Sequence, residues 1–418
     1  MKGNNTTTIL DATEDIDEDE LLFASAGDNL DPDNNDTIMI PADDNGENLV
    51  RNLGKLIAPP YYAFQKARVA QSNRVRDVIR KKILGISDLT PEQKKKIIKE
   101  YNKFSDKELP KMLQDLIDTK RVTGSEAKYL KKLMVTLSDM AKIEYQYKKM
   151  MEQYLPTEII WNEWLSGIHG IGPVLATNLI HHYGDTGRKI YRKDIIKPKK
   201  EGDQEKINLI LIGQESNYPE FLKALKLYVE DTNVPKQYVY KGYNRVEALN
   251  SHSGMTPKGA KGRRRGQNGE KGITLEYSPK LKVLAWKTAE SFVMKKTTPY
   301  RGRYERSKTY ELNLMEQHGK GEQIYLGPDD TIPKYTCKNP KQVELRSQRL
   351  AAKLFLQHYY LVARILSGLK VTRPYAFNKL GHDWKHFTYP PNFPKKRVDE
   401  YLTDPNNILP DDELKDLL

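Results

Sequence analysis

Residues 251–266 read SHSGMTPKGAKGRRRG and combine two kinds of side chain that could do chemistry. Ser251 and Ser253 flank His252, and a serine becomes a nucleophile when a base such as histidine and an orienting group stand beside it. Adjacency in sequence does not create that geometry. The arginine run at 263–265 lies between glycines, so the backbone could approach a phosphate closely while the guanidinium groups bind its oxygens. We therefore predict a nucleic-acid contact here, with a flexible electrostatic tether as the alternative.

Basic side chains continue beyond this run. The window 258–308 holds fifteen Lys or Arg and only four Glu. An aromatic and basic stretch, KQYVYKGYNR at 236–245, precedes it, and its tyrosines could stack on exposed bases or equally pack in the domain core. The predicted RNA- or DNA-binding residues are Lys258, Lys261, Arg263, Arg264, Arg265, Lys271, Arg301, Arg303, Tyr238, Tyr240 and Tyr243.

A second candidate contact lies in WNEWLSGIHGIGPVLATNLIHHYGD at 161–185. An apolar helix should end at Gly167, and Pro173 suits the first position of the next helix. This pattern is typical of a helix-hairpin-helix, whose turn amides contact a phosphate backbone. Gly170 and Gly172 are the predicted turn residues, and a structural helical hairpin is the alternative.

No catalytic or cofactor pattern accompanies these basic segments. The sequence contains no Walker loop, dinucleotide fingerprint or kinase motif, and its histidines lack an HExxH pattern or a cysteine pair. The acidic run from Asp11 to Glu20 has no rigid frame that could hold a cation. We predict no catalytic residue, no metal and no cofactor, and expect that the protein is not an enzyme.

Charge is distributed unevenly along the 418 residues. The net charge is +13, yet residues 1–50 hold fourteen acidic side chains and residues 399–418 hold seven. Removing both ends leaves 67 basic and 35 acidic residues, a balance of +32. Such a body attracts polyanions, usually nucleic acid, although a basic surface without a ligand is the alternative.

Cysteine content and hydropathy limit the cellular compartments in which the protein is expected. Cys337 is the single cysteine, so an intramolecular disulfide framework is excluded and a reducing compartment is expected. No apolar run approaches the roughly 20 residues that cross a bilayer. We therefore expect a cytoplasmic protein that does not contact a membrane.

Helical patterns dominate the chain, so the expected fold class is mainly α. The expected organisation is a disordered acidic tail at 1–48, a helical region at 49–120, a coiled-coil helix at 121–160, a nucleic-acid-binding domain at 161–398 and an acidic tail at 399–418. That domain carries a small mixed insertion at 186–250, with a short strand at 207–213. Thr90 and Gln93 form a capping-box pattern, and 340–368 reads as a long amphipathic helix that ends at Gly368.

The helix within 121–160 carries an apolar seam of approximately heptad spacing, which Glu144 interrupts. Its members are Leu130, Leu133, Leu137, Met140, Tyr147, Met151 and Tyr154. The seam predicts a coiled coil that either folds back within the chain or joins two copies. We expect a homodimer through residues 125–155.

The order of these features resembles the C-terminal half of the bridge-RNA-guided insertion-sequence transposases, which is similar in turn to the Nop domain of box C/D ribonucleoproteins. LSGIHGIGPVLATNLI, SGMTPKGAKGRRRG and LAAKLFLQHYYLVARIL follow a coiled-coil helix in that order, and the resemblance covers about residues 120–370. It implies a Nop-like helical domain that binds RNA.

Two departures from the transposases bear on catalysis. Their N-terminal domain is rich in strands and carries four metal-binding carboxylates, whereas residues 49–120 here read as helical. Their C-terminal half has a catalytic serine shortly before the basic run, whereas Pro257 is followed by KGAKGRRRG. Both parts of the recombinase active site are therefore expected to be missing.

A Nop-like body without nuclease parts is similar to the nuclease-less Tas proteins of tandem interspaced guide RNA systems. That resemblance implies a protein that binds a guide RNA and presents it to target DNA, in a prokaryotic or viral setting. An active transposase or recombinase of the bridge-RNA-guided family is one alternative. A general nucleic-acid-binding structural protein is the other.

Overall fold

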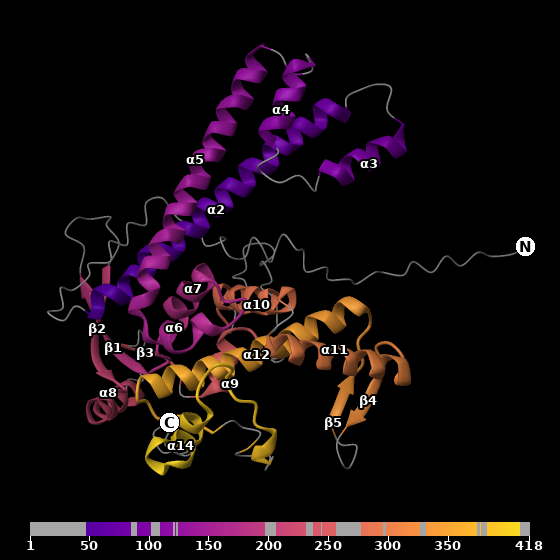
Figure 1. The fold of residues 1–418 in the computed structure, drawn as a ribbon. Coiled ribbons are helices and arrows are strands. Elements are labelled where there is room, and N and C mark those ends of the chain that lie inside the picture. The colour runs from indigo at the N-terminus through magenta and orange to yellow at the C-terminus, as the bar shows by residue number, and fades with distance from the viewer. Residues whose placement is uncertain are drawn as a thin grey trace, which may run out of the picture. The chain divides into compact units, whose positions relative to one another are not determined.

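The structure is a computed structural model that describes residues 47–409 except 85–89, 102–108, 120–121, 123, 197–205, 231–236, 244, 256–276, 296–297, 327–331, 374–376 and 378–382. The described residues are mainly helical and include two small antiparallel sheets, which confirms the predicted fold class (Figure 1). Two compact units divide the chain. We call Pro41–Gly167 with Ile171–Gly184 the helical unit, and Ile168–Gly170 with Asp185–Leu418 the mixed unit.

The helical unit begins with α2 (Glu47–Leu84), α3 (Pro91–Tyr101), α4 (Leu109–Asp118) and α5 (Gly124–Tyr154). The predicted capping box opens α3: Thr90 Oγ1 accepts from the Gln93 amide at 3.2 Å, and Gln93 Oε1 accepts from the Thr90 amide at 2.8 Å. Helix α2 starts well before the apolar pattern at 61–84 and contains Pro59 and Pro60. Helix propensity alone predicts that a helix ends or begins at these two prolines, but α2 continues through both of them.

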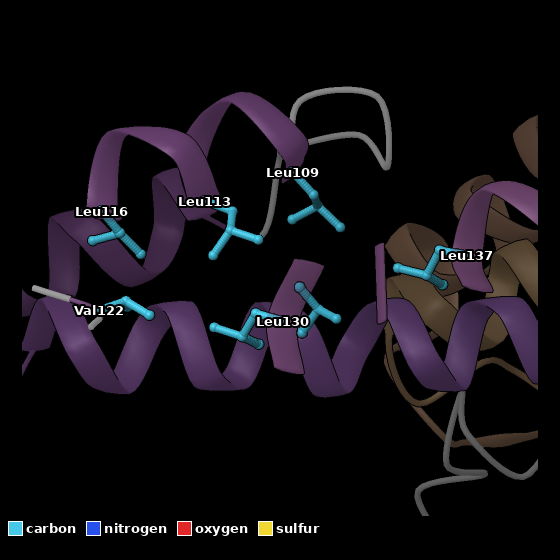
Figure 2. Close-up of a cluster of buried hydrophobic side chains, with 7 residues drawn as sticks. Leu109, Leu113, Leu116, Val122, Leu130 and Leu137 are labelled. Carbon is cyan, nitrogen blue, oxygen red and sulfur yellow. The ribbon is translucent and has the colours of Figure 1, made fainter. Parts of the chain in front are cut away.

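The seam of α5 packs within its own chain. Its leucines join a buried cluster with α2 and α4 whose members are Val75, Leu109, Leu113, Leu116, Val122, Leu130 and Leu137 (Figure 2). Glu144, which interrupts the seam, pairs with Arg68 of α2 at 2.7 Å. Phe64 of α2 stacks on Tyr147 with ring centroids 5.9 Å apart. The seam is therefore covered within the chain by α2 and α4, and the structure does not support a homodimer through it.

Shorter elements complete the helical unit: η1 (Leu155–Thr157), α6 (Ile159–Glu163), η2 (Leu165–Gly167) and α7 (Pro173–Tyr183). The second helix of the predicted helix-hairpin-helix is thus present, with Pro173 at its first position and Gly172 as N-cap. The first helix is only five residues long and continues as a single 3-10 turn.

The mixed unit opens with the insertion, which is a three-stranded antiparallel sheet in the order β2-β1-β3. Its strands are β1 (Lys189–Ile196), β2 (Lys206–Gln214) and β3 (Tyr238–Lys241). Helix α8 (Tyr218–Glu230) packs Phe221 and Ala224 against buried Ile190 of β1. Gly213 of β2 permits this approach, because a Cβ there would lie 2.6 Å from Ala224 Cβ.

Helices form the rest of the mixed unit: α9 (Val246–His252), α10 (Pro279–Met294), α11 (Pro299–His318), α12 (Pro340–Leu366) and α14 (Lys395–Thr403). The single turns η4 (Trp384–His386) and η5 (Pro405–Asn407) lie on either side of α14 in the sequence. The hairpin of β4 (Gln323–Leu326) and β5 (Ile332–Tyr335) connects α11 to α12 and projects from their end (Figure 1).

Capping residues set the starts of three of these helices. Ser278, Thr298 and Asn339 accept hydrogen bonds from the amide at the third helical position of α10, α11 and α12, and proline occupies the first helical position of each.

Aromatic side chains fill the core between these three helices. Phe292 stacks on Tyr300 with centroids 4.5 Å apart, and both contact Phe355. The Tyr300 hydroxyl lies 3.0 Å from Nδ1 of buried His358.

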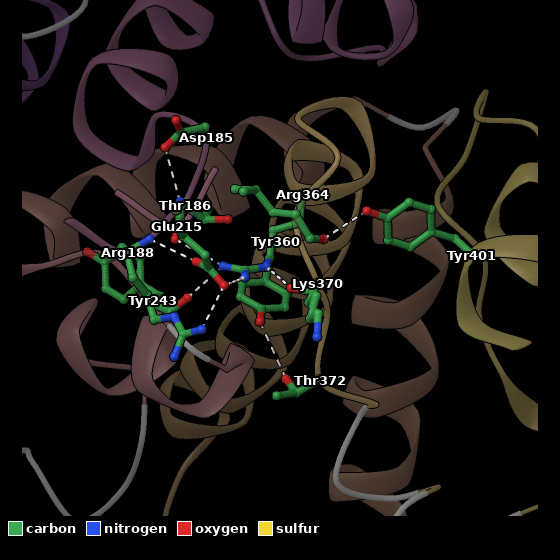
Figure 3. A network of polar contacts seen from close by, with 12 residues as sticks. Asp185, Thr186, Arg188, Glu215, Tyr243, Tyr360, Arg364, Lys370, Thr372 and Tyr401 are labelled. Carbon is green, nitrogen blue, oxygen red and sulfur yellow. Dashed lines mark hydrogen bonds and ion pairs between the residues drawn. The ribbon is translucent and has the colours of Figure 1, made fainter. Parts of the chain in front are cut away.

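A buried polar network fastens the sheet to α12 (Figure 3). Glu215 Oε1 accepts from Arg188 Nη2 at 2.9 Å and also from Arg364 Nη2, while Glu215 Oε2 accepts from the Arg188 amide. Arg364 further donates to the carbonyls of Tyr243 and Lys370, at 3.0 and 2.5 Å. All three charged side chains are at most 2% exposed, so they are structural and not a solvent-accessible site.

Candidate nucleic-acid interface

Most of the basic run singled out in the sequence lies outside the described residues. Lys258, Lys261, Arg263, Arg264, Arg265 and Lys271 all fall within 256–276. Their contact with nucleic acid stays a prediction.

The serines that precede this run are described. Ser251 and His252 end α9, and Ser253 is its C-cap and is fully buried. Burial lowers the pKa of His252, whose ring packs 5.9 Å from that of Tyr243. A nucleophile must reach its substrate, so buried Ser253 cannot act as one in this conformation.

The predicted arginines on α11 have different environments. Arg301 bonds to Glu305 at 2.6 Å and also donates to the carbonyl of Val293 at the end of α10. Arg303 is exposed, and no carboxylate of the described residues pairs with it. Partial desolvation and the neighbouring charge of Arg306 lower the pKa of Arg303. Arg301 is thus engaged within the fold, whereas Arg303 presents a cation to solvent.

The three predicted tyrosines belong to the packing of the mixed unit. Tyr238 and Tyr240 pack against the cluster under α8, and Tyr240 lies 5.8 Å from the ring of Tyr228. Burial raises the pKa of Tyr240 and of Tyr243 to about 12. Of the two alternatives, packing within the mixed unit therefore describes Tyr240 and Tyr243, whose rings are partly buried against Tyr228 and His252.

The two turn glycines also differ. The Gly170 carbonyl accepts a hydrogen bond from Ser291 of α10 at 2.6 Å, and a Cβ on Gly170 would lie 3.2 Å from that hydroxyl. Gly172 caps α7, and no atom lies within 4 Å of the position that its Cβ would occupy. Gly170 therefore supports the fold, and only Gly172 keeps the open surroundings that a phosphate would need.

A basic row that sequence reasoning missed lies on α12. Arg346, Arg349 and Lys353 follow at i, i+3 and i+7, which places them on one side of the helix, and we call them the α12 stripe. Desolvation and the charge of Arg346 lower the pKa of Arg349, and desolvation and the charge of Arg349 lower that of Lys353. Each cation of the stripe is thus close enough to the next one to repel it.

Carboxylates near the stripe are already engaged, one of them by Arg346 of the stripe itself. Glu344 pairs with Lys308 at 2.6 Å. Glu311 pairs with Lys334 at 2.7 Å and with Arg346 at 3.1 Å. Burial would raise the pKa of Glu311, but these two cations outweigh it and the pKa is lowered.

Arg349 and Lys353 consequently remain without a carboxylate partner among the described residues, and Arg349 Nε is buried there without a hydrogen-bond partner. Half-buried neighbouring cations are unfavourable in the free protein, and a polyanion laid along the helix would neutralise them. On α11, which packs along α12, Arg303 and Arg306 are a second pair of neighbouring cations, and neither forms an ion pair with a carboxylate of the described residues.

The stripe was visible in the sequence as RSQRLAAK at 346–353. The amphipathic pattern of 340–368 marks the leucines of this helix as its core-facing residues. The basic side chains between those leucines have helical spacing of their own, and that spacing was the missed signal.

Neither a metal cluster nor a membrane span is found in the part of the chain that the structure describes. No three His, Cys, Asp or Glu side chains there are grouped as they would be to hold a metal ion. None of the helices described there is long and apolar enough to cross a membrane.

Comparisons of the chain with protein-family models, curated proteins and solved structures found no match. The resemblance to guide-RNA and transposase proteins therefore rests on the sequence motifs alone.

Proposed function

We propose that this chain binds nucleic acid, and that RNA is the strand it binds first, along the α12 stripe and the neighbouring arginines of α11. The observation that carries the proposal is the row from Arg346 to Lys353, whose last two cations have no carboxylate partner in the described residues. A phosphate backbone supplies regularly spaced negative charge, and binding it releases counterions.

The wider role we propose is that of a guide-RNA-binding protein that presents its RNA to target DNA and does not cut it. Support comes from the motif order in residues 120–370 and from the excess of basic over acidic residues in the body of the chain. The rival recombinase function would need an accessible serine. Burial of Ser253 argues against that residue as the nucleophile.

Salt dependence of RNA binding tests the interface. We expect Arg349→Gln with Lys353→Gln to reduce the slope of log Kd against log salt by about 1.4 to 1.8, at roughly 0.7 to 0.9 per phosphate contact. The matched control is Lys385→Gln with Lys396→Gln, which removes the same charge from two exposed lysines that pair with Asp383 and Glu400.

Fluorescence anisotropy with a labelled single-stranded RNA over a range of KCl concentrations measures both variants. The control should keep the slope of the unmutated protein. Equal slopes for all three proteins would refute the proposed interface. An equal reduction of the slope in both variants would show that the effect depends only on the net charge of the protein.

Sequencing the RNA that copurifies with the protein tests the wider role. Discrete, guide-like species are the expected result. Random fragments would favour a general nucleic-acid-binding protein instead.

A further inference from the structure

The hairpin between α11 and α12 presents two tyrosines on one face. In its register Gln323 pairs with Tyr335 and Tyr325 pairs with Pro333, so these four side chains share a face. Tyr325 is 54% exposed and Tyr335 is 57% exposed, so both side chains are accessible to a ligand. The two residues occupy diagonal positions of the ladder, which in antiparallel strands lie about 7–8 Å apart.

Hydrogen bonds restrain both rings. Gln323 Nε2 donates to the Tyr325 hydroxyl at 3.2 Å, and the Tyr335 hydroxyl donates to Gln323 Oε1 at 3.1 Å. One amide therefore links both phenols, and a ligand that stacks on the rings loses little side-chain entropy on binding.

The opposite face of the hairpin is fixed to α11. Ile324 is buried, and Lys334 bonds to Glu311 at 2.7 Å while lying 4.6 Å from the centre of the Tyr310 ring. The hairpin is thereby held so that the face bearing Tyr325 and Tyr335 points away from α11.

The hairpin that carries these tyrosines adjoins the α12 stripe. Arg346, the first member of the stripe, donates to the Tyr335 carbonyl at 2.7 Å. Exposed aromatic rings beside a row of cations match the two needs of a single strand, which are stacking for its bases and charge for its phosphates. A base-paired duplex keeps its bases stacked on one another and offers no free ring face.

We propose that Tyr325 and Tyr335 form a stacking platform for unpaired bases of the RNA whose phosphates the α12 stripe binds. The inference rests on the proposed function and adds to it a preference for single strands over duplex. It places the strand across the hairpin and then along α12.

The test compares two probes, a labelled 12-nucleotide oligouridylate and a labelled 16-base-pair RNA duplex. Loss of a stacked aromatic weakens single-strand binding by about 5- to 150-fold per base. Tyr325→Ala with Tyr335→Ala should therefore weaken oligouridylate binding at least about 30-fold at every salt concentration. Duplex binding and both salt slopes should change little.

The matched control is Tyr325→Phe with Tyr335→Phe, which keeps both rings and removes both hydroxyls. It should retain oligouridylate binding to within about fivefold. A Tyr335→Trp variant should show quenched tryptophan fluorescence on adding oligouridylate, which reports contact directly.

Three results would overturn the platform: unchanged oligouridylate binding in the alanine variant, equal losses for duplex and single strand, or a phenylalanine variant as weak as the alanine one. Each of these leaves the salt-dependent contribution of the α12 stripe intact and so spares the proposed function. Salt-independent binding by the unmutated protein would overturn both proposals together.

Discussion

Replacing Glu215 with glutamine removes the carboxylate that pairs with Arg188 and Arg364 in the buried network of Figure 3 while keeping its size. Glu215 Oε1 accepts from both Arg188 and Arg364, so its loss leaves two buried guanidinium groups facing a neutral amide. Two like charges about 5 Å apart repel by about 3 kcal/mol at an effective dielectric constant of about 20. Breaking a buried ion pair from one side costs about 3–5 kcal/mol, and we expect a destabilisation of this size.

Hydrogen–deuterium exchange with mass spectrometry measures this cost within the mixed unit. A destabilisation of 3–5 kcal/mol corresponds to a rise in exchange rate of about 150- to 5,000-fold in peptides from β1, β2 and α12. Peptides from α5 should not change, because the network touches none of its residues.

Glu305→Gln is the matched control. Glu305 is 57% exposed and pairs with Arg301 one helical turn away, so its removal should cost about 0.3–0.5 kcal/mol and raise exchange less than about threefold. If Glu215→Gln changes exchange no more than this control does, the network contributes no net stability and the reasoning is wrong.

Two further perturbations test other parts of the mixed unit. Burial lowers the pKa of His358 to about 4, below its ordinary value of 6.5, so the unfolded chain takes up this proton first as pH falls. The stability that neutral His358 contributes is complete above pH 6.5 and is lost between pH 6.5 and 4, reaching a loss of about 2 kcal/mol at pH 5. Urea unfolding at pH 7 and pH 5 measures how far the free energy of unfolding falls between these two pH values. This fall should be smaller by that amount in His358→Gln than in the unmutated protein, and an equal fall in both proteins would contradict the assignment. Gly242 has a φ of +104°, and a Cβ there would lie 2.2 Å from the Gly187 carbonyl oxygen. Gly242→Ala should destabilise the sheet by about 3 kcal/mol or more, whereas Gly172→Ala, with open surroundings, should cost less than about 1 kcal/mol. Similar melting temperatures for the two variants would refute the packing argument.

Local chemistry allowed several elements to be predicted from sequence. The Thr90–Gln93 capping box and the starts of α7 and α12 depend on residues within one turn of the helix, so their signals are short and readable. The apolar seam of α5 was equally readable, because helical periodicity fixes which side chains share a face. Net charge likewise follows from composition, and it indicated a polyanion as the ligand.

What covers each face was decided only by tertiary structure. The seam of α5 meets α2 of the same chain, and Glu144 is accommodated because Arg68 lies opposite it. Glu215 bonds to Arg188, 27 residues away, and to Arg364, 149 residues away, and neither spacing leaves a pattern in the sequence. Periodicity specifies a face but not its partner, since the partner depends on which distant segments the chain brings together. For the same reason a tyrosine in sequence predicts neither burial, as at Tyr240, nor exposure, as at Tyr335.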